Sequence, residues 1–187
     1  MKTALILIDI QNDYFPGGKM ELEGSVEASI CANRLQSFYR ERKLPVIHIQ
    51  HINIRPGATF FLPSTDGVKI HKNVAPLPGE TVVQKNFPNS FRDTALLGHL
   101  VKEGIKDLVI AGMMTHMCVD STTRAAFDYG FKCTVVADAC ATRSLSFGSR
   151  VIPAEHVNGA FLAALSAVYA TVVNTEDFIS VMIHGEP

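Results

Sequence analysis

The stretch Lys106–Phe131, "KDLVIAGMMTHMCVDSTTRAAFDYGF", places an apolar strand, a tight turn and a helix in succession, and it decides the fold that we predict. "DLVIAG" has the composition of a buried strand that ends at Gly112, and "VDSTTRAAFDYG" predicts a helix that ends at Gly130. A thiol, Cys118, stands between them in the first turn of the expected helix. Cys118 is either a small core residue or a nucleophile. The other reactive side chains of the sequence distinguish these two readings.

The same alternation of strand and helix runs through the whole chain. Apolar runs predict strands at residues 3–10, 44–50, 80–85, 107–112, 132–139 and 169–174. Helices are expected at residues 25–43, 93–104, 119–130 and 153–168, with Ser25 and Asp93 as N-caps and a short helix at the end. The pattern predicts an α/β fold, a three-layer α-β-α sandwich around a mostly parallel, doubly wound, Rossmann-like sheet, in one domain over residues 1–187.

Composition excludes several classes of partner. The net charge of −1 and the scattered lysines and arginines predict no basic surface that would bind nucleic acid or an anionic membrane. The longest nearly apolar stretch, "AFLAALSAVYATVV", is about 14 residues, short of the ~20 needed to span a bilayer. With no export signal in the sequence, we expect a cytoplasmic protein, and the four cysteines have no zinc spacing and predict no disulfides.

Reactive side chains follow the ends of three predicted strands. Asp9 ends the first strand, Lys85 ends "TVVQK", and Cys118 follows the strand that ends at Gly112. Sheets of this kind bind ligands at the carboxyl ends of their strands, so we expect these side chains to meet. Cys118 then serves as nucleophile, with a pKa lowered by the helix start, Asp9 takes its proton, and Lys85 keeps Asp9 ionised.

Each of these residues also has another reading. Asp9 alone fits a turn cap that accepts backbone amides, and Lys85 alone fits a solvated surface lysine. His51, just past the second strand, is the rival base for Cys118. We prefer Asp9 because the first strand usually lies beside the strand that leads to Cys118.

At these residues the sequence resembles the isochorismatase-like cysteine hydrolases, a superfamily that includes nicotinamidases, N-carbamoylsarcosine amidohydrolases and streptothricin-hydrolase-like members. The resemblance is carried by "LILIDIQNDYF", "VVQKNFPNSFRDTALLGHL" and "GIKDLVIAGMMTHMCVDSTTRAAFDYGF". It implies a catalytic triad of Asp9, Lys85 and Cys118, and a cis peptide between Met113 and Met114. It also implies an oxyanion hole of the Met114 and Cys118 amides, and a homo-oligomer.

The sequence departs from the metal-dependent nicotinamidases, which carry an Asp-x-His segment after the second strand. Here "HIQHINI" puts His51 and Asn53 at those positions. An imidazole in place of a carboxylate and an amide in place of an imidazole leave a poor site for zinc or manganese. We therefore predict no metal and no other cofactor.

Substrate-binding residues are predicted from their closeness to the three motifs. Phe15 and Phe91 are expected to form apolar walls, and the long loop 53–79 exposes Phe60 and Phe61, which would cover the pocket or pack on another subunit. The full predicted set is Gln11, Phe15, Asn89, Ser90, Phe91, Thr115 and His116.

The sequence thus favours a hydrolase that cleaves a C–N bond in a small amide, cyclic amide or ureido substrate. Two alternatives stay open: vinyl-ether hydrolysis of the isochorismatase type, and a non-catalytic binding or regulatory member of the same fold. A nucleotide-binding domain fits poorly, because no G-x-G-x-x-G or P-loop motif follows any strand.

Overall fold

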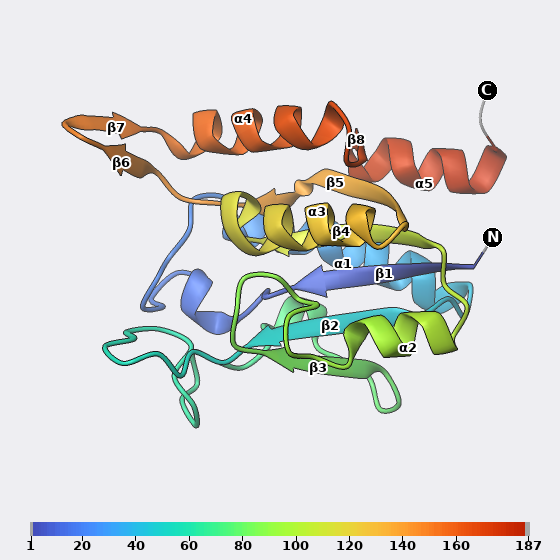
Figure 1. Ribbon diagram of the computed structural model, residues 1–187, viewed down its shortest axis with the longest axis horizontal. Helices are drawn as coiled ribbons and strands as arrows, with labels where there is room; N and C mark the ends of the chain where they lie inside the picture. The colour runs from blue at the N-terminus through green and yellow to red at the C-terminus, as the bar shows by residue number, and fades with distance from the viewer. Residues whose placement is uncertain (1, 186–187) are drawn as a thin grey trace.

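The computed structural model describes residues 2–185, so both ends of the predicted domain 1–187 lie outside the described residues. A six-stranded, all-parallel sheet forms its centre, with the strand order β3-β2-β1-β4-β5-β8 (Figure 1). Its strands are β1 Thr3–Ile8, β2 Val46–His51, β3 Thr81–Lys85, β4 Asp107–Met113, β5 Lys132–Ala141 and β8 Thr171–Val173. The α/β prediction is confirmed, including the pairing of the first strand with the strand before Cys118.

Helices cover both faces of the sheet, and the alternating side chains of β1 show how. Leu5 and Leu7 face a core shared with α1 (Ser25–Glu41) and α5 (Thr175–His184). Ala4, Ile6 and Ile8 face the opposite core, which is shared with α2, α3 and α4. These last helices span Leu96–Lys102, Asp120–Asp128 and Ala154–Ser166. β1 is buried on both sides, as its unbroken apolar run predicts.

Several predicted boundaries were wrong in detail. Gly24, with φ 72°, is the N-cap of α1, so Ser25 is already the first helical residue. α2 begins only at Leu96 with Ala95 as its cap, because Asp93 adopts a left-handed conformation in the preceding turn. A two-stranded hairpin, β6 Leu145–Phe147 and β7 Arg150–Ile152, was not predicted, and it projects from the body of the molecule (Figure 1).

Two short helical segments also lie between the strands. A 3-10 turn, Asn12–Tyr14, follows β1, and another, Lys72–Val74, lies in the long loop that the sequence predicts after β2. No helix within residues 2–185 combines the length and apolar character needed to cross a lipid bilayer.

Gly112 lets β1 and β4 approach closely where the reactive side chains gather. It pairs with Ile8 in the register of the two strands and has φ +139°, a value that side-chain-bearing residues rarely adopt. A Cβ at this position would collide with backbone atoms of Ile8. Backbone cannot move aside as a flexible side chain can, so the β1–β4 contact requires glycine here.

We expect Gly112→Ala to lower the free energy of unfolding by at least about 2 kcal/mol, through the collision and the strained backbone. Urea unfolding followed by circular dichroism measures the change. Gly98→Ala is the matched control, since a Cβ at this α2 position meets open space. The control should raise stability by about 0.5–1 kcal/mol. Equal midpoints for Gly112→Ala and the parent chain would contradict the structural role of Gly112.

Candidate active site

The ends of three strands bring Asp9, Lys85 and Cys118 together. Asp9 follows β1, Lys85 is the last residue of β3, and Cys118 lies in a π-helical turn, Thr115–Val119, between β4 and α3. Lys85 Nζ lies 2.7 Å from Asp9 Oδ2, and both side chains are 0% exposed. Cys118 Sγ, a carboxylate oxygen of Asp9 and a ring nitrogen of His51 all lie within 4.8 Å of one another. The structure therefore forms the predicted cluster.

Lys85 is held by its surroundings as well as by Asp9. Its ammonium donates hydrogen bonds to the carbonyl oxygens of Phe87 and Pro88, each at 3.1 Å, and to His51 Nδ1 at 3.3 Å. Burial lowers the pKa of Lys85, but the Asp9 carboxylate more than offsets this and leaves the pKa above its ordinary value. Lys85 is a buried cation, which excludes the reading as a solvated surface lysine.

Asp9 does not act as a turn cap. Its backbone adopts a left-handed conformation with φ 51°, which aspartate tolerates better than most residues. Neither carboxylate oxygen accepts a well-directed hydrogen bond from any residue in the described part of the chain. The carboxylate is held at Oδ2 by the charge of Lys85.

His51 is a weak candidate for the base. An ammonium has no acceptor, so the Lys85 contact obliges His51 Nδ1 to accept and places the imidazole proton on Nε2. Burial lowers the pKa of His51 to about 4, and the Lys85 charge acts in the same direction against the opposing effect of Asp9. At neutral pH His51 is uncharged, and its basic nitrogen is already engaged.

The expectation of a lowered thiol pKa at Cys118 was wrong. Burial raises the pKa of the Cys118 thiol well above its ordinary value, and the Asp9 carboxylate raises it further, while Lys85 opposes both. Cys118 also precedes α3, which begins at Asp120, so its position in the π-helical turn does not offset the loss of water. The resting residue is a neutral thiol.

Asp9, His51 and Cys118 are also the residues in the described chain whose ligand atoms gather closely enough to suggest a metal site. They do not fit one. The Lys85 ammonium already lies against Asp9 Oδ2 and His51 Nδ1, so a divalent cation would meet a buried positive charge at its own ligands. Asn53, two residues after His51, would offer a metal only a neutral amide.

A small cavity of about 240 Å³ opens onto Cys118. Apolar side chains form most of its wall, and polar groups come from β2 and the loop that follows it. The lining residues are Tyr14, His51, Asn53, Arg55, Phe60, Pro88, Met114, Met117 and Cys118. The Met113–Met114 peptide is cis, as the resemblance implies, and Met114 lies beside Cys118 in the wall. Phe60 lines the cavity, whereas its neighbour Phe61, predicted to be exposed, is fully buried.

None of the residues predicted to bind substrate lines this cavity. The buried Gln11 amide bonds to backbone: it donates to the oxygens of His51 and Val68 at 2.9 and 2.7 Å and accepts from the His51 N–H at 2.7 Å. Gln11 therefore fixes the backbone that carries His51. Asn89 accepts the Phe91 N–H at 2.9 Å, and so shapes its own turn.

Four other residues predicted to line the cavity instead contact the surrounding structure. Ser90 Oγ lies 2.8 Å from Thr122 Oγ1, and Phe91 packs on Tyr129 with ring centroids 5.2 Å apart. Thr115 Oγ1 donates to the Ala141 oxygen at 3.2 Å. His116 Nδ1 pairs with Thr142 Oγ1, and its ring contacts Phe161 edge-on.

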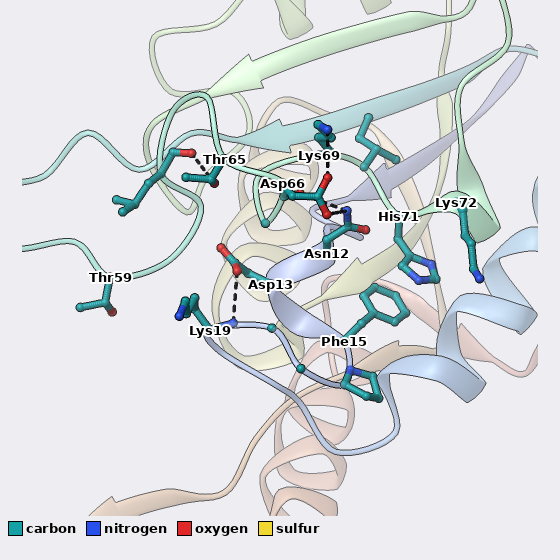
Figure 2. Close-up of a pocket in the computed structure, with 16 residues that line it drawn as sticks. Asn12, Asp13, Phe15, Lys19, Thr59, Thr65, Asp66, Lys69, His71 and Lys72 are labelled. Carbon is teal, nitrogen blue, oxygen red and sulfur yellow. Dashed lines mark hydrogen bonds and ion pairs between the residues drawn. The ribbon is translucent and has the colours of Figure 1, made fainter.

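Phe15 lies in a different depression from its neighbour Tyr14, which lines the cavity at Cys118. Its ring stacks on His71 with centroids 3.6 Å apart, in a hollow of about 690 Å³ between residues 12–19 and 59–72. Figure 2 shows the two stacked rings, with Asp66 paired to Lys69 nearby. This hollow shares no lining residue with the cavity at Cys118. The 3-10 turn after β1 directs Tyr14 toward Cys118 and Phe15 away from it.

Known proteins resemble this chain over nearly its whole length. A family model described as "Isochorismatase domain" matches residues 3–177. The isochorismatase family protein YddQ of Bacillus subtilis is 53% identical over 96% of this chain and 99% of its own. A solved structure of a putative isochorismatase hydrolase from Oleispira antarctica superposes with a TM-score of 0.91 at 47% identity, covering 96% of each chain.

More distant relatives are named hydrolases. A streptothricin hydrolase of Streptomyces noursei is 32% identical over 74% of this chain and 49% of its own. Nicotinamidase 3 of Arabidopsis thaliana and maleamate amidohydrolase of Pseudomonas putida are each 29% identical, over 75% and 76% of this chain.

The electrostatics of Cys118 predict that Asp9→Asn makes its thiol more reactive toward iodoacetamide. Removing the carboxylate leaves the Lys85 charge unopposed, which lowers the thiol pKa and raises the thiolate fraction at pH 8, by up to about tenfold for each pKa unit. Peptide mass spectrometry separates Cys118 from the other cysteines. Asp66→Asn, at an exposed carboxylate, is the control and should leave the rate unchanged. A slower reaction in Asp9→Asn would show that the carboxylate activates the resting thiol.

Proposed function

The chain belongs to the isochorismatase family of hydrolases, and from that premise we propose that it cleaves a C–N bond in a small amide, cyclic amide or ureido compound through a thioester on Cys118. The observation that carries the proposal is the cluster of Cys118, Asp9 and Lys85 at the bottom of a small cavity. Relatives named nicotinamidase and maleamate amidohydrolase support amide chemistry. A binding role alone leaves the buried charge pair unexplained.

In the first half of the proposed reaction, Cys118 Sγ attacks the carbonyl carbon while its proton passes to Asp9. Because the resting thiol is neutral, attack and proton transfer occur together rather than from a standing thiolate. The Met114 and Cys118 amides hold the oxygen that becomes negative. When the tetrahedral adduct collapses, the C–N bond breaks and the leaving nitrogen takes the proton from Asp9.

In the second half, water attacks the thioester carbonyl and gives a proton to Asp9. The C–S bond then breaks, the acid product leaves, and Asp9 returns its proton to Cys118. Lys85 donates no proton in this cycle. Its charge lies 2.7 Å from Asp9 Oδ2 and compensates the buried carboxylate.

We place the enzyme in a reducing compartment, the cytoplasm, because all four cysteines are unpaired thiols. The homo-oligomer implied by the family resemblance stays a prediction, to be measured by light scattering.

Cys118→Ala should lower turnover by at least about 10³-fold, because the nucleophile carries the chemistry and water cannot replace it in the same geometry. A panel of small amides and ureido acids, read by ammonia release, provides the assay. Cys133→Ala is the matched control, since Cys133 is a buried thiol whose contacts are Phe131 and Thr123 in the core, away from the cavity. An unchanged melting temperature verifies the fold of each variant. Ammonia release by Cys118→Ala at the parent rate would refute the proposal.

A further inference from the structure

Arg55 is a positive charge at the cavity that the chain itself does not neutralise. Its side chain is exposed to solvent and lines the cavity on Cys118. No carboxylate within residues 2–185 forms an ion pair with Arg55. Arg143 and Arg150 are also unpaired there, but neither lines this cavity. The lining contains no acidic residue.

The charges beneath the cavity cancel and leave Arg55 in excess. Asp9 and Lys85 form a neutral pair at 2.7 Å. His51 is uncharged at neutral pH, and Cys118 is a thiol. The free site therefore carries about one net positive charge, which favours an anionic ligand over a neutral one.

The loop that carries Arg55 is fixed by hydrogen bonds at both ends. Asn53 Oδ1 accepts the Arg55 N–H at 3.3 Å, and the Arg55 oxygen accepts the Ala58 N–H at 3.1 Å. Farther along, the buried carboxylate of Asp13 accepts the Phe61 N–H at 2.6 Å. The turn is thus held against the 3-10 segment after β1, and the guanidinium is presented to the cavity from an ordered backbone.

The size of the cavity limits what the charge can bind. A water molecule occupies about 30 Å³ in the liquid, so the 240 Å³ space holds a compound of few heavy atoms. Phe60, Met114 and Met117 give it apolar sides. A guanidinium presents paired donors that match the two oxygens of a carboxylate.

From these observations we propose that Arg55 binds a carboxylate of the substrate, so that the preferred substrate is a small monoamide or ureido acid with its C–N bond at Cys118 and its acid group at the cavity mouth. This inference rests on the proposed hydrolase function and names the substrate class of that site. Arg55 determines specificity and takes no part in bond making.

Succinamate and succinamide test the inference, because they have the same number of heavy atoms and differ in one carboxylate. The parent enzyme should have kcat/KM at least about tenfold higher for succinamate, the size expected for a hydrogen-bonded charge pair. Arg55→Gln should lower kcat/KM for succinamate by about 10- to 100-fold, mainly through KM, and change succinamide by less than about threefold. Arg55→Lys should recover part of the loss. Arg150→Gln, on the exposed strand β7, is the matched control and should behave as the parent.

A binding assay keeps the inference testable without turnover. Succinate, which carries the same acid group, should slow the alkylation of Cys118 by iodoacetamide in the parent protein and in Arg150→Gln, and not in Arg55→Gln. Equal effects of Arg55→Gln on acid and amide, or equal protection by succinate with and without Arg55, would overturn the role of Arg55. The protection assay needs no turnover, so failure of this inference and failure of the proposed reaction are distinguishable.

Discussion

The ion pair between Asp9 and Lys85, 2.7 Å apart and closed to solvent, is the constraint on which the site depends. Burying two charges is costly, and burying either one alone costs several kcal/mol more. The pair is possible because β1 and β3 end at the same edge of the sheet, with β2 between them. It also fixes the neighbours: the Lys85 ammonium determines the His51 tautomer, and its remaining hydrogen bonds tie down the backbone at Phe87 and Pro88.

The same pair explains why the nucleophile rests as a thiol. A fully buried thiolate beside a carboxylate is unfavourable even with an ammonium in contact, and the pKa of Cys118 is raised accordingly. The proposed reaction then requires that Cys118 Sγ attacks the substrate carbonyl carbon while the thiol proton passes to Asp9. A neutral thiol in a small cavity is protected from oxidation until that moment, because the thiolate is the reactive form.

The sequence predicts the scaffold and the reactive cluster well, for identifiable reasons. Parallel strands buried on both faces appear as unbroken apolar runs, and the chemistry of such folds gathers at strand ends, which leads to Asp9, Lys85 and Cys118. The pocket walls were not predictable in this way. The 3-10 turn after β1 points the neighbouring side chains of Tyr14 and Phe15 in different directions. The Gln11 amide forms its hydrogen bonds with backbone groups that are distant in the sequence. Arg55 lies in a loop without periodicity, and the exposed hairpin β6–β7 has no buried face to signal it.

A double-mutant cycle on the free energy of unfolding tests the central claim most directly, using Asp9→Asn, Lys85→Met and the two combined. Lys85→Met leaves the buried Asp9 carboxylate without its partner, and Asp9→Asn leaves the buried Lys85 ammonium without its partner. The double variant contains neither charge. The ion pair predicts that the two losses are far from additive, with a coupling energy of about 3 kcal/mol. Additive losses, with a coupling energy near zero, would mean that the two charges do not depend on each other and would contradict this account of the site.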